Sequence, residues 1–228
     1  MGQTSNTNVG AIDRVMANLR DYVPPKAMVL DFTERVIFVI LFGFFAIRMI
    51  SSFDMRLDFA VSLLIISELL PIALIASRKW SRTLSISDRP LDWALGFIGS
   101  SIPLLSVQGA ANTLIPQAAC AVIILIGLAI QISAKVVLWR SFGVVPANHG
   151  VKAGGPYRFV RHPMYAGYTI VHAGFLLAFP SLWNAVVYSS ALAAQIARLL
   201  REERLLNDDP KYRAFSSRVR FRLFPGVY

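Results

Sequence analysis

Long apolar stretches alternate with short polar segments along the chain, and this pattern predicts the fold. A helix needs about 20 mostly apolar residues to span a bilayer. Stretches close to this length cover residues 32–51, 58–77, 92–108, 114–139, 165–181 and 183–200. The third is the weakest, because it is short and contains Pro103. The fifth and sixth are separated only by a short segment around Ser181, which predicts a tight helical hairpin. The pattern therefore predicts an all-α, polytopic membrane bundle of about six transmembrane helices.

The composition agrees with a membrane protein. Of the 228 residues, 55% are hydrophobic and 16% are charged, a balance that does not suit a soluble domain of this length. The net charge of +10 could suggest nucleic acid, but the Lys and Arg residues lie in the loops and tail between apolar stretches. This is the distribution of cytoplasmic flanks that face anionic lipid, so we expect no nucleic-acid partner.

The same basic residues predict the topology. They follow the second, fourth and sixth stretches, whereas residues 108–113 after the third stretch carry no charge. Six helices with both termini in the cytoplasm satisfy this bias. Near the end of the fourth stretch, Lys135 and Arg140 are expected to snorkel to the interface. The compact chain favours a bacterial cytoplasmic membrane, with the endoplasmic reticulum as the alternative.

Familiar signatures of soluble enzymes are absent from the sequence, and the histidines lack metal-ligand spacing, so a metal site is not expected. Candidate chemistry lies instead in a Gly-rich loop, Asn148 to Tyr157, whose backbone can approach a ligand closely. Directly after it come Arg161, His162 and Pro163. Proline suits the first turn of a helix, where free N–H groups can meet an anionic ligand group. The alternative reading is a set of interfacial anchors.

A pair of acids, Glu202 and Glu203, follows the sixth stretch in a tail that is otherwise basic. A carboxylate here could bind hydroxyl or amino groups of a cofactor. The alternative is an i,i+4 pair between Arg198 and Glu202 on a solvated helix face. These two readings have equal weight.

Together these motifs carry a family resemblance. Residues from about 135 to 228 resemble the isoprenylcysteine carboxyl methyltransferase and phospholipid methyltransferase group of integral membrane enzymes. The matching elements are His149, Gly155-Pro156-Tyr157, Arg161-His162-Pro163, Tyr165, Gly167, Glu202-Glu203, Leu205, Tyr212 and Phe224-Pro225.

The resemblance implies S-adenosyl-L-methionine as methyl donor, bound at the cytoplasmic face by the loop before the fifth helix and the C-terminal tail. The donor-binding residues that it implies are His149, Val151, Gly155, Tyr157, Arg161, His162, Pro163, Tyr165, Glu202 and Glu203. Among them, Arg161 is expected to engage the donor's carboxylate. His162 and Tyr165 are also the expected catalytic groups, because an amine acceptor needs a base.

The implied acceptor is a lipophilic molecule that enters from the bilayer: a prenylcysteine-like carboxylate, a lipid amine or a thiol. Glu68, in the second stretch, is a candidate for meeting its head group, since a carboxyl group in lipid is costly and should face the bundle interior. A structural hydrogen bond is the equal alternative for Glu68.

Three parts follow from this layout. Residues 1–31 form an N-terminal cytoplasmic arm, either an interfacial helix or a mobile segment. Residues 32–134 form the N-terminal transmembrane helices on the acceptor side, and residues 135–228 form the methyltransferase core. The rival interpretations are an NADPH-dependent, sterol-type membrane reductase, which has a similar Arg-His-Pro-x-Tyr run, and a non-enzymatic membrane protein. The sequence does not predict an oligomeric state.

Overall fold

The computed structural model describes residues 25–52, 70–75, 85–107, 113–148 and 150–227. Within these ranges the chain is mostly helical, as predicted. The helices are α2 (Pro25–Ser52), α4 (Pro90–Ser101), α5 (Gln117–Leu138), α6 (Pro163–Ala178), α7 (Leu182–Leu206) and α8 (Pro210–Arg218). Short 3-10 turns follow α4, follow α5 and precede α6, at Ile102–Leu105, Trp139–Ser141 and Gly155–Arg158.

The first, fourth, fifth and sixth apolar stretches are all helical, in α2, α5, α6 and α7. The hairpin prediction is confirmed, because only three residues separate the end of α6 at Ala178 from the start of α7 at Leu182. Ser181 caps α7, since its hydroxyl accepts a hydrogen bond from the Asn184 N–H at 3.1 Å. The third stretch departs from a continuous helix: α4 ends at Ser101, where the 3-10 turn that contains Pro103 begins.

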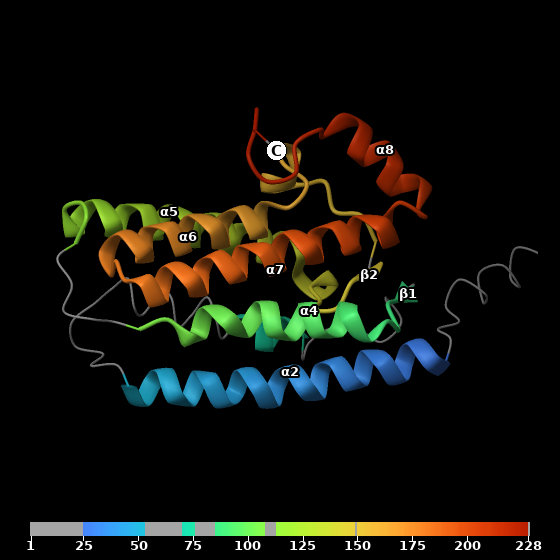
Figure 1. Cartoon of the computed structure of the whole chain (residues 1–228). Helices are drawn as coiled ribbons and strands as arrows, with labels where there is room; N and C mark the ends of the chain where they lie inside the picture. The colour runs from blue at the N-terminus through green and yellow to red at the C-terminus, as the bar shows by residue number, and fades with distance from the viewer. Residues whose placement is uncertain (1–24, 53–69, 76–84, 108–112, 149, 228) are drawn as a thin grey trace, which may run out of the picture.

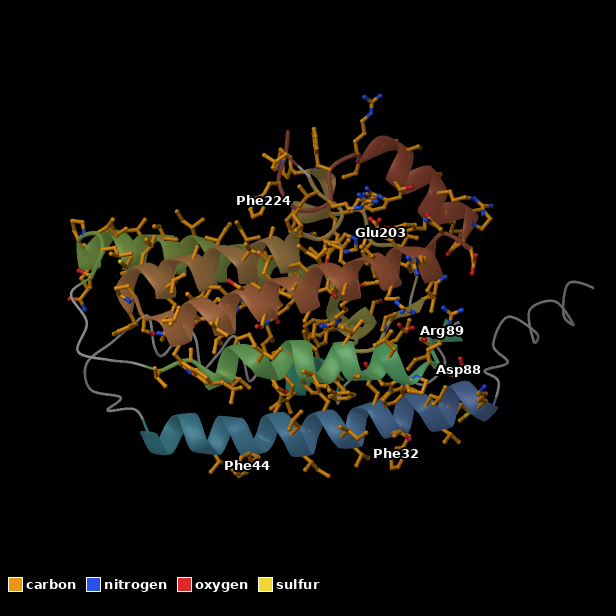
Figure 2. All side chains as sticks on the ribbon, viewed as in Figure 1. Phe32, Phe44, Asp88, Arg89, Glu203 and Phe224 are labelled. Atoms are coloured by element: carbon orange, nitrogen blue, oxygen red, sulfur yellow. The ribbon has the colours of Figure 1, made fainter. Side chains whose placement is uncertain are left out.

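The length and composition of the helices give one candidate membrane span. Among the described residues, α5 is long and apolar enough to span a bilayer by length and composition. Of the second stretch, the structure describes residues 70–75, which are helical; the N-terminal arm up to residue 24 lies outside the described ranges. Apolar side chains on α2 are exposed as well, and Figure 2 shows Phe32 and Phe44 on the side of α2 away from the other helices.

The helices lie side by side, with α2 on one side of the group, then α4, and then α7, α6 and α5 (Figure 1). Helix α8 and the C-terminal segment cover one end. A small antiparallel pair of strands, β1 (Ser85–Ile86) and β2 (Ala147–Asn148), joins the segment before α4 to the loop after α5. This pair is an addition to the predicted all-α fold, and it fixes the loop that carries the candidate chemistry.

Helices α5 and α6 are in backbone contact through glycines. A Cβ atom on Gly167 would lie 2.8 Å from the carbonyl oxygen of Gly127 and 2.9 Å from the backbone nitrogen of Gln131. A Cβ on Gly127 would lie 2.8 Å from the nitrogen of Val171. Small residues at a helix interface are the usual means of close packing in membranes. This contact holds the start of α6 in place.

A buried carboxylate on α2 contacts the loop that leads to the candidate site. The Glu34 side chain on α2 is fully buried, and its Oε1 accepts hydrogen bonds from the backbone N–H groups of Val144 at 2.6 Å and Val145 at 2.8 Å.

The prediction that Lys135 snorkels to the interface is wrong, because its side chain is fully buried. Its Nζ lies 3.4 Å from Gln131 Oε1 and 5.2 Å from the centre of the Tyr168 ring. Such partners make a buried ammonium group tolerable.

Candidate active site

A polar cavity of about 80 Å³ lies between the loop after α5, the start of α6, the end of α7 and α8. The residues that line it are Leu138, Ser141, Ala147, Gly150, Val151, Lys152, Tyr157, Arg161, His162, Met164, Tyr165, Glu202, Leu206, Tyr212 and Phe215. The cavity thus gathers residues from both of the motifs that the sequence singled out, the Arg-His-Pro run and the acidic tail.

Glu203 is the centre of the ion-pair network behind this cavity. Its Oε1 lies 2.9 Å from Arg161 Nη1 and 3.2 Å from His162 Nε2, and its Oε2 lies 2.8 Å from Arg222 Nε. The Tyr212 hydroxyl donates a longer hydrogen bond, 3.4 Å, to Oε1. Both carboxylate oxygens are therefore engaged within the protein.

These partners determine the protonation state of Glu203. Burial of the carboxyl group would raise its pKa, but the hydrogen bonds from His162 and Arg222 and the charges of His162 and Arg161 outweigh burial and lower the pKa to about 2. Glu203 is thus a carboxylate at neutral pH, and it neutralises part of the positive charge of the tail.

The C-terminal tail is attached to the start of α6 through the backbone. The Arg161 N–H donates to the carbonyl of Phe221 and the His162 N–H to that of Arg222, both at 2.9 Å. Arg161 Nη2 donates to the Arg220 carbonyl at 3.2 Å. Pro163 at the first position of α6 is almost fully buried. These bonds fix the tail beside Arg161 and His162, two residues that line the cavity.

Glu202 and three tyrosines form another wall. The Tyr165 hydroxyl donates a hydrogen bond of 2.9 Å to Glu202 Oε2. Burial and the negative charge of Glu202 raise the pKa of Tyr157 well above its usual value, so its hydroxyl stays protonated. Burial, with the charges of Glu203 and Glu202, raises the pKa of Tyr212 in the same way. The carboxylate of Glu202 thus shares this wall with protonated tyrosine hydroxyl groups.

Most of the sequence-predicted donor residues line this cavity: Val151, Tyr157, Arg161, His162, Tyr165 and Glu202. The other three that the structure describes lie behind its surface. Gly155 has a φ of +55°, where glycine is favoured, and a Cβ there would lie 2.9 Å from Val137 Cγ2. Pro163 and Glu203 support the wall from behind. His149 and Glu68 lie outside the described residues.

Sequence reasoning missed several residues at this end of the molecule. Asn148 accepts from the Gly150 N–H at 2.9 Å and donates to Asp209 Oδ2 at 3.0 Å, which fixes the Gly-rich loop against α8. The hydrogen bond from Asn148 also lowers the pKa of Asp209. Phe215 completes the cavity lining from α8. The aromatic spacing of Tyr212 and Phe215 in a polar tail was the available signal for α8.

A second cavity, of about 160 Å³, lies among α2, α4, α5, α6 and α7 and is mainly apolar. Its apolar lining includes Phe38, Leu95, Leu104, Val171 and Phe175. The polar residues among its lining are Ser100, Ser106, Gln131, Tyr165, Tyr168, His172, Tyr188, Gln195 and Arg198.

The two cavities share a wall. Met164 and Tyr165, at the start of α6, line both of them. Arg198 lies on the apolar side of this wall, with its guanidinium carbon 5.4 Å from the centre of the Tyr165 ring. The expected i,i+4 pair between Arg198 and Glu202 on a solvated face is not formed, because Arg198 is 7% exposed and bonds to Ser100 and Gly143 instead.

The structure is thus a helical bundle in which two cavities of different polarity share the wall formed by Met164 and Tyr165. Residues 116–209, which include α5, α6 and α7, match the phospholipid methyltransferase family, and the resemblance predicted from the sequence is confirmed for this part of the chain. The family implies a membrane methyltransferase. No match to this chain was found among the curated proteins.

Proposed function

We propose that this protein is an integral membrane methyltransferase that transfers a methyl group from S-adenosyl-L-methionine to a lipophilic acceptor at the cytoplasmic membrane face. The single observation that carries this proposal is the shared wall at Met164 and Tyr165, with a polar cavity on one side and an apolar cavity on the other. A transfer between two molecules of opposite polarity needs this arrangement, because the reacting atoms must be held in contact without water.

The residues of the polar cavity fit the donor. Arg161 Nε is buried and has no hydrogen-bond partner among the described residues, so it remains available for the donor's carboxylate. Glu202 suits its ammonium or ribose hydroxyl groups, while Val151, Tyr157 and His162 shape the pocket. Gly155 and Pro163 hold the backbone of this wall, and His149 belongs to the proposed set from the family resemblance alone.

When bound, S-adenosyl-L-methionine supplies an electrophilic methyl carbon on a sulfonium, which becomes a neutral thioether as the new bond forms. The protein aligns the acceptor and excludes water. A carboxylate or thiolate acceptor needs no base, whereas an ammonium acceptor must first lose a proton. Tyr165 lies at the shared wall and His162 lies beside it, with ring centres 5.7 Å apart, so these two are the proposed catalytic groups. Glu68 is proposed to meet the acceptor head group.

We further propose a six-helix membrane arrangement with both termini in the cytoplasm. The apolar exposure of α2 and the hydropathy of α5 support lipid contact, and the basic residues of the tail support the orientation. In this arrangement residues 32–134 serve the acceptor side, residues 135–228 form the catalytic core, and residues 1–31 form the cytoplasmic arm. A bacterial cytoplasmic membrane is the proposed location, with the endoplasmic reticulum as the alternative.

Calorimetric binding to the purified protein in lipid nanodiscs tests this function. S-Adenosylmethionine and its demethylated product should both bind, and NADPH should not. Arg204→Gln is the matched control for Arg161→Gln, because Arg204 is an exposed residue that does not line either cavity. We expect only Arg161→Gln to weaken donor binding. Binding of NADPH alone would replace the methyltransferase proposal with the reductase.

A further inference from the structure

We infer that Gln195 and Arg198 form the head-group site of the acceptor, and that this site selects an amphiphile with an anionic oxygen, either a carboxylate or a phosphate. The inference rests on the proposed function and narrows its acceptor. Both residues come from α7, both line the apolar cavity, and neither is part of the predicted donor set.

Arg198 provides the positive charge. Its side chain is buried, yet its polar contacts are neutral: Nη1 donates to Ser100 Oγ at 3.2 Å and Nη2 to the Gly143 carbonyl at 3.1 Å. The guanidinium carbon of Arg198 also lies 5.4 Å from the centre of the Tyr165 ring. Within the part of the chain that the structure describes, Arg198 forms no ion pair. Burial of an uncompensated charge is costly, and an anionic ligand group would offset this cost.

Gln195 provides the second polar group. It lies one helical turn before Arg198, so the two side chains project from the same face of α7. Gln195 is 8% exposed, and its Oε1 is buried without a hydrogen-bond partner among the described residues. A buried amide without a partner is unfavourable in the free protein. A hydroxyl, amide or amine group beside the anionic oxygen of the ligand would satisfy it.

The rest of the cavity indicates the ligand's other end. The cavity is mainly apolar, and phenylalanine, leucine and valine side chains from several elements contribute to its lining, which suits a hydrocarbon chain. No Asp or Glu is present among the described residues that line this cavity, so the charge that these residues offer to a head group is the positive charge of Arg198. Because Arg198 lies against Tyr165 of the shared wall, a head group at Arg198 is also next to the donor cavity.

Thermal unfolding in a neutral detergent tests this selection without relying on turnover. The probes are laurate, dodecyl phosphate, dodecanol and dodecyltrimethylammonium, which share one chain length and differ in head group. We expect at least one of the two anions to bind about tenfold more tightly than dodecanol or the cation. Preference for laurate assigns a carboxylate, and preference for dodecyl phosphate assigns a phosphate. Equal binding of all four probes, or tightest binding of the cation, overturns the inference.

Three variants sharpen the test. Gln195→Glu places a carboxylate one turn from Arg198 and should abolish the preference for anions. It keeps the size of the side chain, and Gln195 Oε1 has no hydrogen-bond partner among the described residues, so the fold should be retained. Arg198→Lys should keep part of the preference, because it keeps the charge. Arg204→Gln removes an equal charge from an exposed position of α7 and should change nothing. Loss of the preference in Arg204→Gln would show that net charge, and not the cavity, selects the ligand.

Donor binding measured on the same preparations separates this inference from the proposed function. Wild-type protein that prefers anionic amphiphiles but does not bind S-adenosylmethionine would defeat the proposed function, and Gln195 and Arg198 would remain an anion site of another kind. Intact donor binding with no head-group preference would defeat only the acceptor site. With labelled donor, methylation of laurate or of phosphatidylethanolamine in vesicles identifies the source of the anionic oxygen, and Gln195→Glu should raise the KM for that acceptor more than it lowers kcat.

Discussion

The two cavities differ in how their charged groups are satisfied. Behind the polar cavity, Glu203 is bonded to groups from the residues directly before α6, from α8 and from the tail through both of its oxygens. In the apolar cavity, Arg198 has only neutral partners, and Gln195 Oε1 has none among the described residues. A buried polar group that is fully bonded within the protein stabilises the fold, whereas one that is not is available to a ligand.

The difference also separates the two acids that the sequence presents as a pair. Glu203 faces inward to a network of cations, and Glu202 faces the cavity with one hydrogen bond from Tyr165. The same tail motif thus combines a residue that holds the tail in place with a residue that is open to a ligand. Four measurements test this difference between the two cavities.

The largest effect is expected for Glu203→Gln. The substitution leaves Arg161 and Arg222 without their shared carboxylate, so the free energy of unfolding should fall by about 3 kcal/mol. Glu202→Gln is the matched control, because it is the neighbouring acid and keeps an oxygen for the Tyr165 hydroxyl; it should cost less than about 1 kcal/mol. Thermal and denaturant unfolding of both variants provides the measurement. Equal losses would contradict the distinction between the two acids.

A pH series on the same variants should give an effect of similar or smaller size. The folded pKa of Glu203, about 2, lies below its ordinary value of 4.5, so ionised Glu203 stabilises the folded state above about pH 4.5. This contribution is lost as the pH falls from about 4.5 to about 2. The difference in stability between wild type and Glu203→Gln should therefore be constant from pH 7 to pH 5 and shrink below that range. A difference that does not change with pH would show that ionisation of Glu203 is not what stabilises the tail.

The features that leave a local signal in the sequence could be predicted, and the contacts between distant residues could not. Periodicity and hydropathy predict α2, α5, α6 and α7, because long apolar helices leave a strong local signal. The Arg-His-Pro run and the acidic pair predict the polar cavity. The sequence does not reveal that Glu203 is internally bonded, since its partners Arg161 and Arg222 are distant in the chain and meet only in the fold.

Burial of single polar residues is the other feature that sequence reasoning did not predict. Lys135 and Arg198 both resemble surface residues in the sequence, one at a helix end and one in an i,i+4 spacing with Glu202. In the structure both are buried: an aromatic ring of α6 lies against each, Gln131 of α5 lies beside Lys135, and the Gly143 carbonyl of the loop after α5 accepts from Arg198. Local spacing contains no information on which helices lie opposite.

Gly167→Ala should disturb the apolar cavity and spare the polar one. The added Cβ would lie 2.7 Å from Gln131 Cγ and would meet the backbone of α5, so α5 and α6 must separate. Overpacking of this kind costs about 1 to 3 kcal/mol. Gly43→Ala on α2 is the control, because nothing lies within 4 Å of its added Cβ. The measurements are thermal unfolding and the binding of amphiphiles and donor; weaker amphiphile binding with unchanged donor binding is expected. If donor binding were lost and amphiphile binding retained, the contact between α5 and α6 would support the polar cavity instead of the apolar one.

Tyr165→Phe should give the smallest effect and the sharpest separation of the two cavities. It removes the hydroxyl that donates to Glu202 and leaves the ring on which Arg198 lies. This hydrogen bond is worth about 1 kcal/mol and holds Glu202 at the polar cavity. Its loss should therefore weaken donor binding roughly fivefold. Binding of the anionic amphiphile should not change, because its site is on the ring side of the residue. Tyr165→Leu removes the hydroxyl and the ring together and should weaken both ligands. Calorimetric titration of donor and amphiphile into the two variants distinguishes these roles: if Tyr165→Phe weakened both ligands equally, the hydroxyl would serve a single joint site, and the division into two cavities would lose its functional meaning.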